Sequence, residues 1–198
     1  MIYFSNQFLL VAEQLQVYSS PLIAQVKFQQ DYFSEYPQQI RFGTEQSTVL
    51  YSRKPGYYAV HYKQPGTVAP GAVLQLNDGA IAVFQGEPDE SENAIRLAST
   101  TGTLGPIYTL QADGTLAVPT GLVFIRFVEG VEVESHREAI KQAGYEIAQS
   151  LSYAPHTAWL HAPSGNILDA LVGISKLEAI PNVENVEPQM LMERVQRR

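Results

Sequence analysis

The last third of the chain constrains the fold most, because it alternates between strand-like and helix-like patterns in a fixed order. Four segments have the apolar or alternating pattern of a strand: 122–128, 146–153, 157–162 and 183–187. Two segments between them have apolar residues at helical spacing: 135–143 and 167–180. The resulting order, β-α-β-β-α-β, predicts a ferredoxin-like domain. We expect both helices to cover one face of a four-stranded antiparallel sheet and to leave the other face open.

Capping residues set the ends of these two helices. Ser135 and Glu138 have the spacing of a capping box, and Gly144 is a natural stop after the first helix. Asn166 is expected to cap the second helix, which Pro181 ends because proline has no backbone N–H and clashes with the preceding turn.

The first 121 residues have a different pattern. A short helix is expected at 7–17, behind the cap Ser5-Asn6, and then short segments rich in strand-forming residues follow. These segments are 22–28, 47–51, 57–62, 73–76, 80–84, 107–110 and 115–118. The turn cluster Pro119-Thr120-Gly121 predicts the border between a mostly antiparallel β domain, 1–121, and the ferredoxin-like domain with its C-terminal tail, 122–198. The predicted class is therefore α+β.

Two tight hairpins are expected within the β domain. Asp78-Gly79 and Asp113-Gly114 each separate two apolar runs, and Asp-Gly suits the positive φ angles of a primed turn. The two hairpins are 35 residues apart in sequence, which fits either an internal repeat or an ordinary meander.

Composition limits the classes of partner. The formal charge is -7, with 13 Lys and Arg against 20 Asp and Glu, which argues against a nucleic-acid partner. The chain has no Cys, which excludes disulfides and thiol chemistry. No apolar stretch is long enough to span a bilayer, so no membrane partner is expected. The N-terminus lacks the basic region of a signal peptide, so the default expectation is cytoplasmic; a fragment of a longer secreted protein would look the same.

Residues that carry chemistry do not form a recognisable catalytic or metal-binding pattern. The four histidines are His61, His136, His156 and His161, and none has metal-ligand spacing with another. No phosphate loop and no nucleophile elbow is present. We therefore expect no catalytic residue, no metal, no cofactor and no enzymatic activity.

One segment carries a family resemblance. The run Ala179-Ile180-Pro181-Asn182-Val183-Glu184-Asn185-Val186-Glu187-Pro188 resembles the end of a subtilase propeptide, where a helix breaks at proline and a V-x-x-V-E-P strand follows. Val123-Phe124-Ile125-Arg126-Phe127 resembles the first strand of such a propeptide. The resemblance covers 122 to about 190 and is nearest to the N-terminal prodomains of fervidolysin-like bacterial subtilases.

The resemblance implies a non-catalytic role. Prodomains of this family act as intramolecular chaperones and inhibitors of a subtilisin-like serine protease, with the open sheet face on the enzyme and the C-terminal tail in its substrate cleft. The G-T-S-x-A-x-P segment of subtilases is absent here. The chain would therefore act on a protease in cis, as part of a precursor, or in trans, as a free-standing relative.

The expected enzyme-facing residues on the sheet are Phe124, Arg126 and Trp159. Arg126 decides which alternate residues of the first strand face the helices, because a charge in the middle of that strand should not face two helices. Ile125 and Phe127 then point to the core. For Trp159 the alternative is packing against the N-terminal domain.

The tail has two possible registers in a protease cleft. The terminal register uses Val195, Gln196, Arg197 and Arg198, and the inner register uses Gln189, Met190, Leu191 and Met192. The apolar composition favours the inner register, and the end that processing would leave favours the terminal one. A third possibility is a helical tail, since most of these residues are good helix formers.

A second function from another class stays open. A ligand-sensing or oligomerising ferredoxin-like module with an attached β domain would also fit the order of elements. The tail distinguishes the two, because a sensor module needs no extended decapeptide after its last strand.

Overall fold

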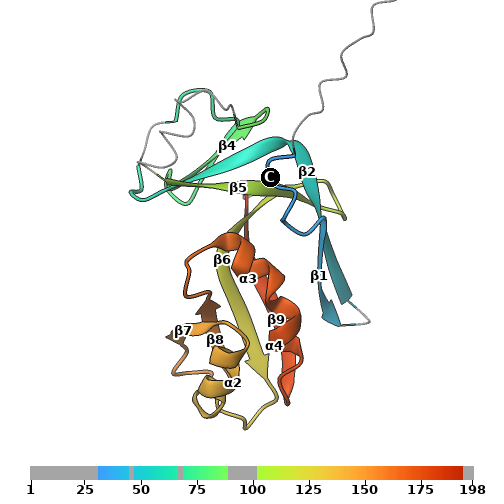
Figure 1. Cartoon of the computed structure of the whole chain (residues 1–198), viewed down its shortest axis with the longest axis vertical. Coiled ribbons are helices and arrows are strands. Elements are labelled where there is room, and N and C mark those ends of the chain that lie inside the picture. Colours follow the sequence, from blue (N-terminus) through green and yellow to red (C-terminus); the bar gives the residue numbers. More distant parts are fainter. Residues whose placement is uncertain (1–30, 45–46, 67–68, 89–101, 194–198) are drawn as a thin grey trace, which may run out of the picture. The chain divides into compact units, whose positions relative to one another are not determined.

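A computed structural model describes residues 31–44, 47–66, 69–88 and 102–193 (Figure 1). These residues belong to one compact unit, 31–198. The helix expected at 7–17 and the strand expected at 22–28 lie outside the described residues.

Strands dominate the described part of the chain. They are β1 (Gln39–Thr44), β2 (Ser47–Tyr62), β3 (Leu74–Leu76), β4 (Ile81–Gln85), β5 (Gly102–Leu110), β6 (Leu116–Phe127), β7 (Glu146–Ser150), β8 (Thr157–His161) and β9 (Val183–Met192). The helical elements are the 3₁₀ turn η1 (Val133–His136) and the helices α2 (Arg137–Gln142), α3 (Ile167–Val172) and α4 (Ile174–Glu178).

All these strands belong to one sheet, and every pairing is antiparallel. The strand order is β3-β4-β2-β5-β6-β8-β7, with β1 added to β2 and β9 added to β6. Helices and a mostly antiparallel sheet together make the described part an α+β structure, so the predicted class is confirmed at this level.

The strand β6 runs through the expected domain border (Figure 1). Its first residues pair with β5, at Thr109↔Leu116, and its last residues pair with β8, at Arg126↔Thr157. The sequence predicted a turn at Pro119-Thr120-Gly121. This prediction is wrong, because the three residues form an irregularity inside a strand. Gly121 has a φ of +88°, and the register with β9 shifts between Pro119 and Val123. Two apolar runs separated by turn-forming residues are here one long strand.

The helices bury their apolar sides against one face of the strands β6, β8 and β9. Val123, Ile125 and Phe127 of β6 share a buried cluster with Ile140 of α2 and Leu177 of α4. Figure 1 shows α2, α3 and α4 beside these strands. Since side chains alternate along a strand, the even-numbered residues of this part of β6 point to the opposite face.

A second apolar cluster lies between the strands of the other half of the sheet. Its buried members are Ala59, Leu76, Ile81, Val83, Ile107 and Val118. Leu191, close to the end of β9, packs against this cluster, so β9 contributes to the cores of both halves.

Of the four predicted helix ends, three are confirmed, among them the end before Pro181, since α4 stops at Glu178. Asn166 caps α3, its side chain accepting a hydrogen bond from the Leu168 N–H at 2.9 Å. After α2 the N–H groups of Gly144 and Tyr145 donate to the carbonyls of Lys141 and Ile140, the pattern of a Schellman motif with Gly144 at φ +95°. The capping box at Ser135 is wrong, because a 3₁₀ turn begins earlier and the Ser135 hydroxyl donates to the Glu132 carbonyl.

The helix expected at 167–180 is interrupted at Gly173, between α3 and α4. Tyr145 explains the interruption: its buried hydroxyl donates to the Ala170 carbonyl at 2.6 Å. A Cβ at position 173 would lie 2.6 Å from that same hydroxyl oxygen, so only glycine fits. The sequence pattern could not reveal a side chain arriving from a different element.

Both predicted hairpins are present, with loops longer than a two-residue turn. In the β3–β4 hairpin Leu76 pairs with Ile81, and Asn77, Asp78 and Gly79 all have positive φ. In the β5–β6 hairpin the Asp113 carboxylate accepts from the Thr115 N–H at 2.9 Å, and Gly114 has a φ of +75°.

Candidate interaction surface: the open sheet face and the end of β9

The face of the sheet away from the helices carries an aromatic pair. Phe124 of β6 is directly opposite Trp159 of β8, and the two rings meet edge to face with centroids 5.3 Å apart. Arg126 follows two residues later on the same side of β6. All three side chains are partly exposed. The three residues predicted for this face therefore lie together on it, and we call them the aromatic face.

Polar groups border the aromatic face. The Nε atom of Arg126 lies 2.9 Å from the Glu184 carboxylate. Across β9, the register places Glu187 opposite Phe124, and the Asn185 amide donates to the Glu187 carboxylate at 2.6 Å. On the far side, Gln149 of β7 is opposite Trp159. Apolar rings surrounded by polar side chains are the usual composition of a protein interface.

The end of β9 differs from the expected free tail. The last strand was expected to end at Glu187, but β9 continues to Met192. Met190, Leu191 and Met192 pair with Pro119, Val118 and Ala117 of β6. These three residues of the inner register are thus held in the protein's own sheet, and the helical alternative is wrong for them.

Side-chain contacts add to this pairing. Met190 packs against one apolar cluster and Leu191 against the other. The Tyr51 hydroxyl donates to the Met192 sulfur at 3.8 Å. Burial, with a smaller contribution from the charge of Glu187, raises the pKa of Tyr51, so this hydroxyl keeps its proton at neutral pH. Binding the inner register in a protease cleft would require the end of β9 to leave both clusters.

The terminal register lies outside the described residues. Val195, Gln196, Arg197 and Arg198 follow Glu193, the last residue that the structure describes. The geometry of β9 therefore bears on the inner register, whose residues Met190, Leu191 and Met192 would have to leave the sheet to enter a cleft.

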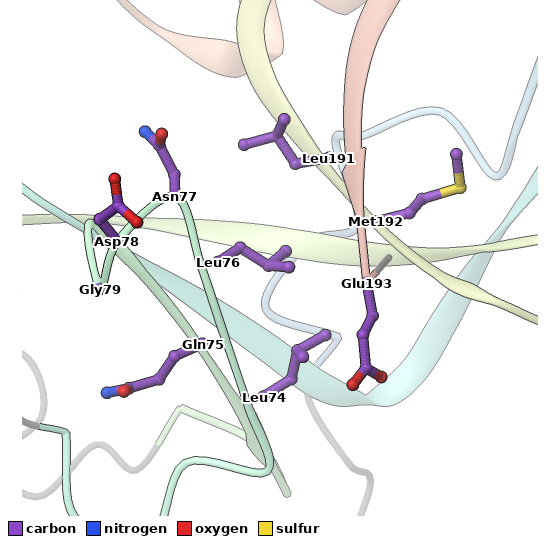
Figure 2. Close-up of a pocket in the computed structure, with 9 residues that line it drawn as sticks. All are labelled: Leu74, Gln75, Leu76, Asn77, Asp78, Gly79, Leu191, Met192 and Glu193. Carbon is purple, nitrogen blue, oxygen red and sulfur yellow. The ribbon is translucent and has the colours of Figure 1, made fainter. Parts of the chain in front are cut away.

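A groove next to the end of β9 was not predicted. Its volume is about 650 Å³, and it is lined by the residues 74–79 of the β3–β4 hairpin and 191–193 of β9. Figure 2 shows Leu74 and Leu76 pointing from β3 toward β9, and Leu191 pointing back toward the hairpin. In the sequence, the alternating leucines at 74 and 76 indicate an apolar side of a strand. Their proximity to Leu191, which is distant in sequence, follows only from the arrangement of the strands.

Three of the four histidines have neighbours that account for them structurally. His136 packs its ring on Phe127 with centroids 4.5 Å apart, and the His161 Nε2 atom lies 3.7 Å from the Glu146 carboxylate. Burial lowers the pKa of His61 to about 4. Among the residues that the structure describes, no group of three His, Asp or Glu side chains is arranged to hold a metal ion.

The helices in the described ranges are all too short or too polar to cross a bilayer. Comparison with known proteins adds no family to these findings: no protein-family model matches the chain, and no similar protein was found among curated proteins or solved structures.

Proposed function

We propose that this protein is a prodomain-like inhibitor and folding chaperone of a subtilisin-like serine protease, with no catalytic role of its own. In this proposal residues 122–190 form a ferredoxin-like domain. The aromatic face binds the enzyme surface, and the segment after β9 enters the substrate cleft. The protease is encoded either in the same precursor or separately.

The observation that carries the proposal is the arrangement around β6. The strand order β9-β6-β8-β7 is antiparallel throughout, and apolar residues of the intervening helices share one cluster with one face of β6. This arrangement supports a ferredoxin-like domain with one covered and one open face. The aromatic face lies on the open side, where buried aromatic anchors contribute most to a protein interface.

The position of β9 supports the terminal register. Since Met190–Met192 already pair with β6 and Leu191 packs in a core cluster, the segment that binds the cleft is assigned to 195–198. An extended segment can add main-chain hydrogen bonds to the strands of a protease cleft and place alternate side chains in its pockets. The terminal register calls for a protease that accepts Arg beside the scissile bond.

The test is inhibition of a panel of subtilisin-like proteases by three forms of the chain. These forms are the full chain, a deletion of 194–198, and a Phe124→Ala/Trp159→Ala variant. We expect the deletion and the double variant each to weaken inhibition by at least tenfold. Tyr153→Ala is the control, because Tyr153 is an aromatic residue that is 84% exposed in the turn between β7 and β8 and is not part of the aromatic face.

The three forms separate the parts of the proposal. If the deletion inhibits as well as the full chain, docking of the terminal register is wrong. If the double variant inhibits as well, the aromatic face does not contact the enzyme.

An oligomerising or ligand-sensing module is the second candidate. The observation in its favour is the same partly exposed ring pair, which could be covered by a second copy of this chain as well as by an enzyme. Sedimentation equilibrium distinguishes the two: a dimer that Trp159→Ala dissociates, together with no inhibition of any protease, would favour the module.

A further inference from the structure

We propose that the groove between the β3–β4 hairpin and the end of β9 is a docking site for an extended, basic segment of a partner protein. The segment would lie beside β9 and extend the sheet there. This inference does not depend on the proposed function, since none of the described residues that line the groove belongs to the aromatic face.

The apolar surface of the groove is the continuation of a core. Leu76 is buried in the second apolar cluster, and Leu74 and Leu191 are partly buried against it. Figure 2 shows these three side chains converging from two strands that are not paired with each other. Leucines left half-covered at such a position can gain burial from the side chains of an added segment, at roughly 25 cal/mol per Å² of apolar surface.

Strand pairing supplies the second part of the argument. Within the described residues, β9 is paired as a strand with β6 alone, so the side of β9 away from β6 has no strand partner there. An edge of this kind is a template for an added strand, which gains main-chain hydrogen bonds along its length. The groove of about 650 Å³ is next to that edge and opens between it and the hairpin.

Charge gives the chemistry of the occupant. The charged side chains among the nine described residues that line the groove are Asp78 and Glu193, and both are acids. Figure 2 shows the two carboxylates on opposite walls, Asp78 at the hairpin tip and Glu193 at the end of β9. An occupant with apolar residues at alternate positions and Lys or Arg at its ends matches this pattern.

The experiment measures binding of synthetic seven-residue peptides to the full chain by fluorescence polarisation. The probe has the sequence K-V-T-V-T-V-K. One comparison peptide, E-V-T-V-T-V-E, reverses the end charges, and another, K-V-T-P-T-V-K, replaces the central Val by Pro, which cannot donate a main-chain hydrogen bond. We expect both comparison peptides to bind at least tenfold more weakly than the probe.

A variant of the two acids tests the charge argument. Asp78→Asn/Glu193→Gln should reduce the preference for the Lys-ended over the Glu-ended peptide by at least fivefold. Asn tolerates the positive φ of +53° at position 78, so the turn is retained. Asp113→Asn is the matched control, because Asp113 is in the other hairpin and does not line the groove; it should leave the preference unchanged.

Several results would overturn the proposal. One is absence of probe binding at millimolar concentration, and another is equal binding of the Pro peptide, which would show apolar capture without strand addition. Binding that appears only after deletion of 194–198 would assign the groove to the chain's own C-terminal segment. A dimer that the probe dissociates would assign it to a second copy.

Discussion

Phe124 and Trp159 face each other across the β6–β8 pair, with ring centroids 5.3 Å apart and ring planes inclined by 60°. Both rings lie on the face opposite the buried residues Val123, Ile125 and Leu160. A pair of large aromatic side chains in partial contact with solvent contributes little to the core of the protein. It offers a rigid apolar surface to a partner, which is why the proposed function depends on it.

The first prediction concerns the energy of this ring pair. Edge-to-face pairs are worth about 0.5–1.5 kcal/mol beyond the area they bury. A double-mutant cycle with Phe124→Ala and Trp159→Ala, measured by urea unfolding, should give a coupling free energy in that range. A coupling near zero would mean that the two rings do not hold each other in place in solution.

The second prediction concerns the interruption between α3 and α4. Alanine is the better helix former, yet Gly173→Ala should lower the free energy of unfolding by roughly 1–3 kcal/mol, because the new methyl group overlaps the Tyr145 hydroxyl. Ser175→Ala, at an exposed position of α4, is the control and should change stability little. An increase in stability for Gly173→Ala would show that Tyr145 does not occupy this position.

The third prediction concerns the β3–β4 hairpin. Gly79 has a φ of +79°, a conformation that β-branched residues tolerate poorly. Gly79→Val should therefore reduce the free energy of unfolding by roughly 1 kcal/mol or more. Gly79→Asn is the comparison, since Asn adopts positive φ more easily, and it should have a smaller effect. Equal effects of Val and Asn would place the strain elsewhere.

The fourth prediction concerns pH. His61 is on β2, opposite Ile81 and Thr103, with its ring over Gly105. Burial lowers its pKa from 6.5 to about 4, so folding favours the neutral ring. The stability from this neutral ring is fully present above pH 6.5 and is lost as the pH falls toward 4. By linkage the loss amounts to about 3 kcal/mol.

The measurement for this prediction is urea unfolding between pH 7 and 4 for the natural chain and for His61→Gln. The unfolding free energy of the natural chain minus that of His61→Gln should fall as the pH is lowered across this range, because only the natural chain loses the contribution of the neutral ring. A constant difference would mean that His61 titrates alike in the folded and unfolded chain.

Local signals in the sequence predicted several features of the fold correctly. Asn166, Gly144 and the two Asp-Gly hairpins depend on residues close in sequence, and each is present. Which side chains of β6 point toward the helices could be predicted from the charge of Arg126 alone. Long-range relationships were not predictable in this way. The continuity of β6 through Gly121, the interruption at Gly173 and the pairing of Met190–Met192 with β6 each depend on a partner from a distant element.

The candidate site also has one part that local sequence patterns predicted and one part that they could not predict. Alternation along β6 and β8 is a local property, so Phe124 and Trp159 could be placed on one face from the sequence. The groove combines Leu76 with Leu191, and that combination exists only because the end of β9 pairs with Ala117–Pro119, which precede the expected domain border.

The proposed function is inhibition of subtilisin-like proteases. The most direct measurement is the inhibition constant of the full chain against a panel of such proteases, with a chymotrypsin-like serine protease as control. We expect tight, substrate-competitive inhibition of at least one member that accepts Arg beside the scissile bond, and no inhibition of the control. Absence of inhibition across the panel, or equal inhibition of the control, would contradict it.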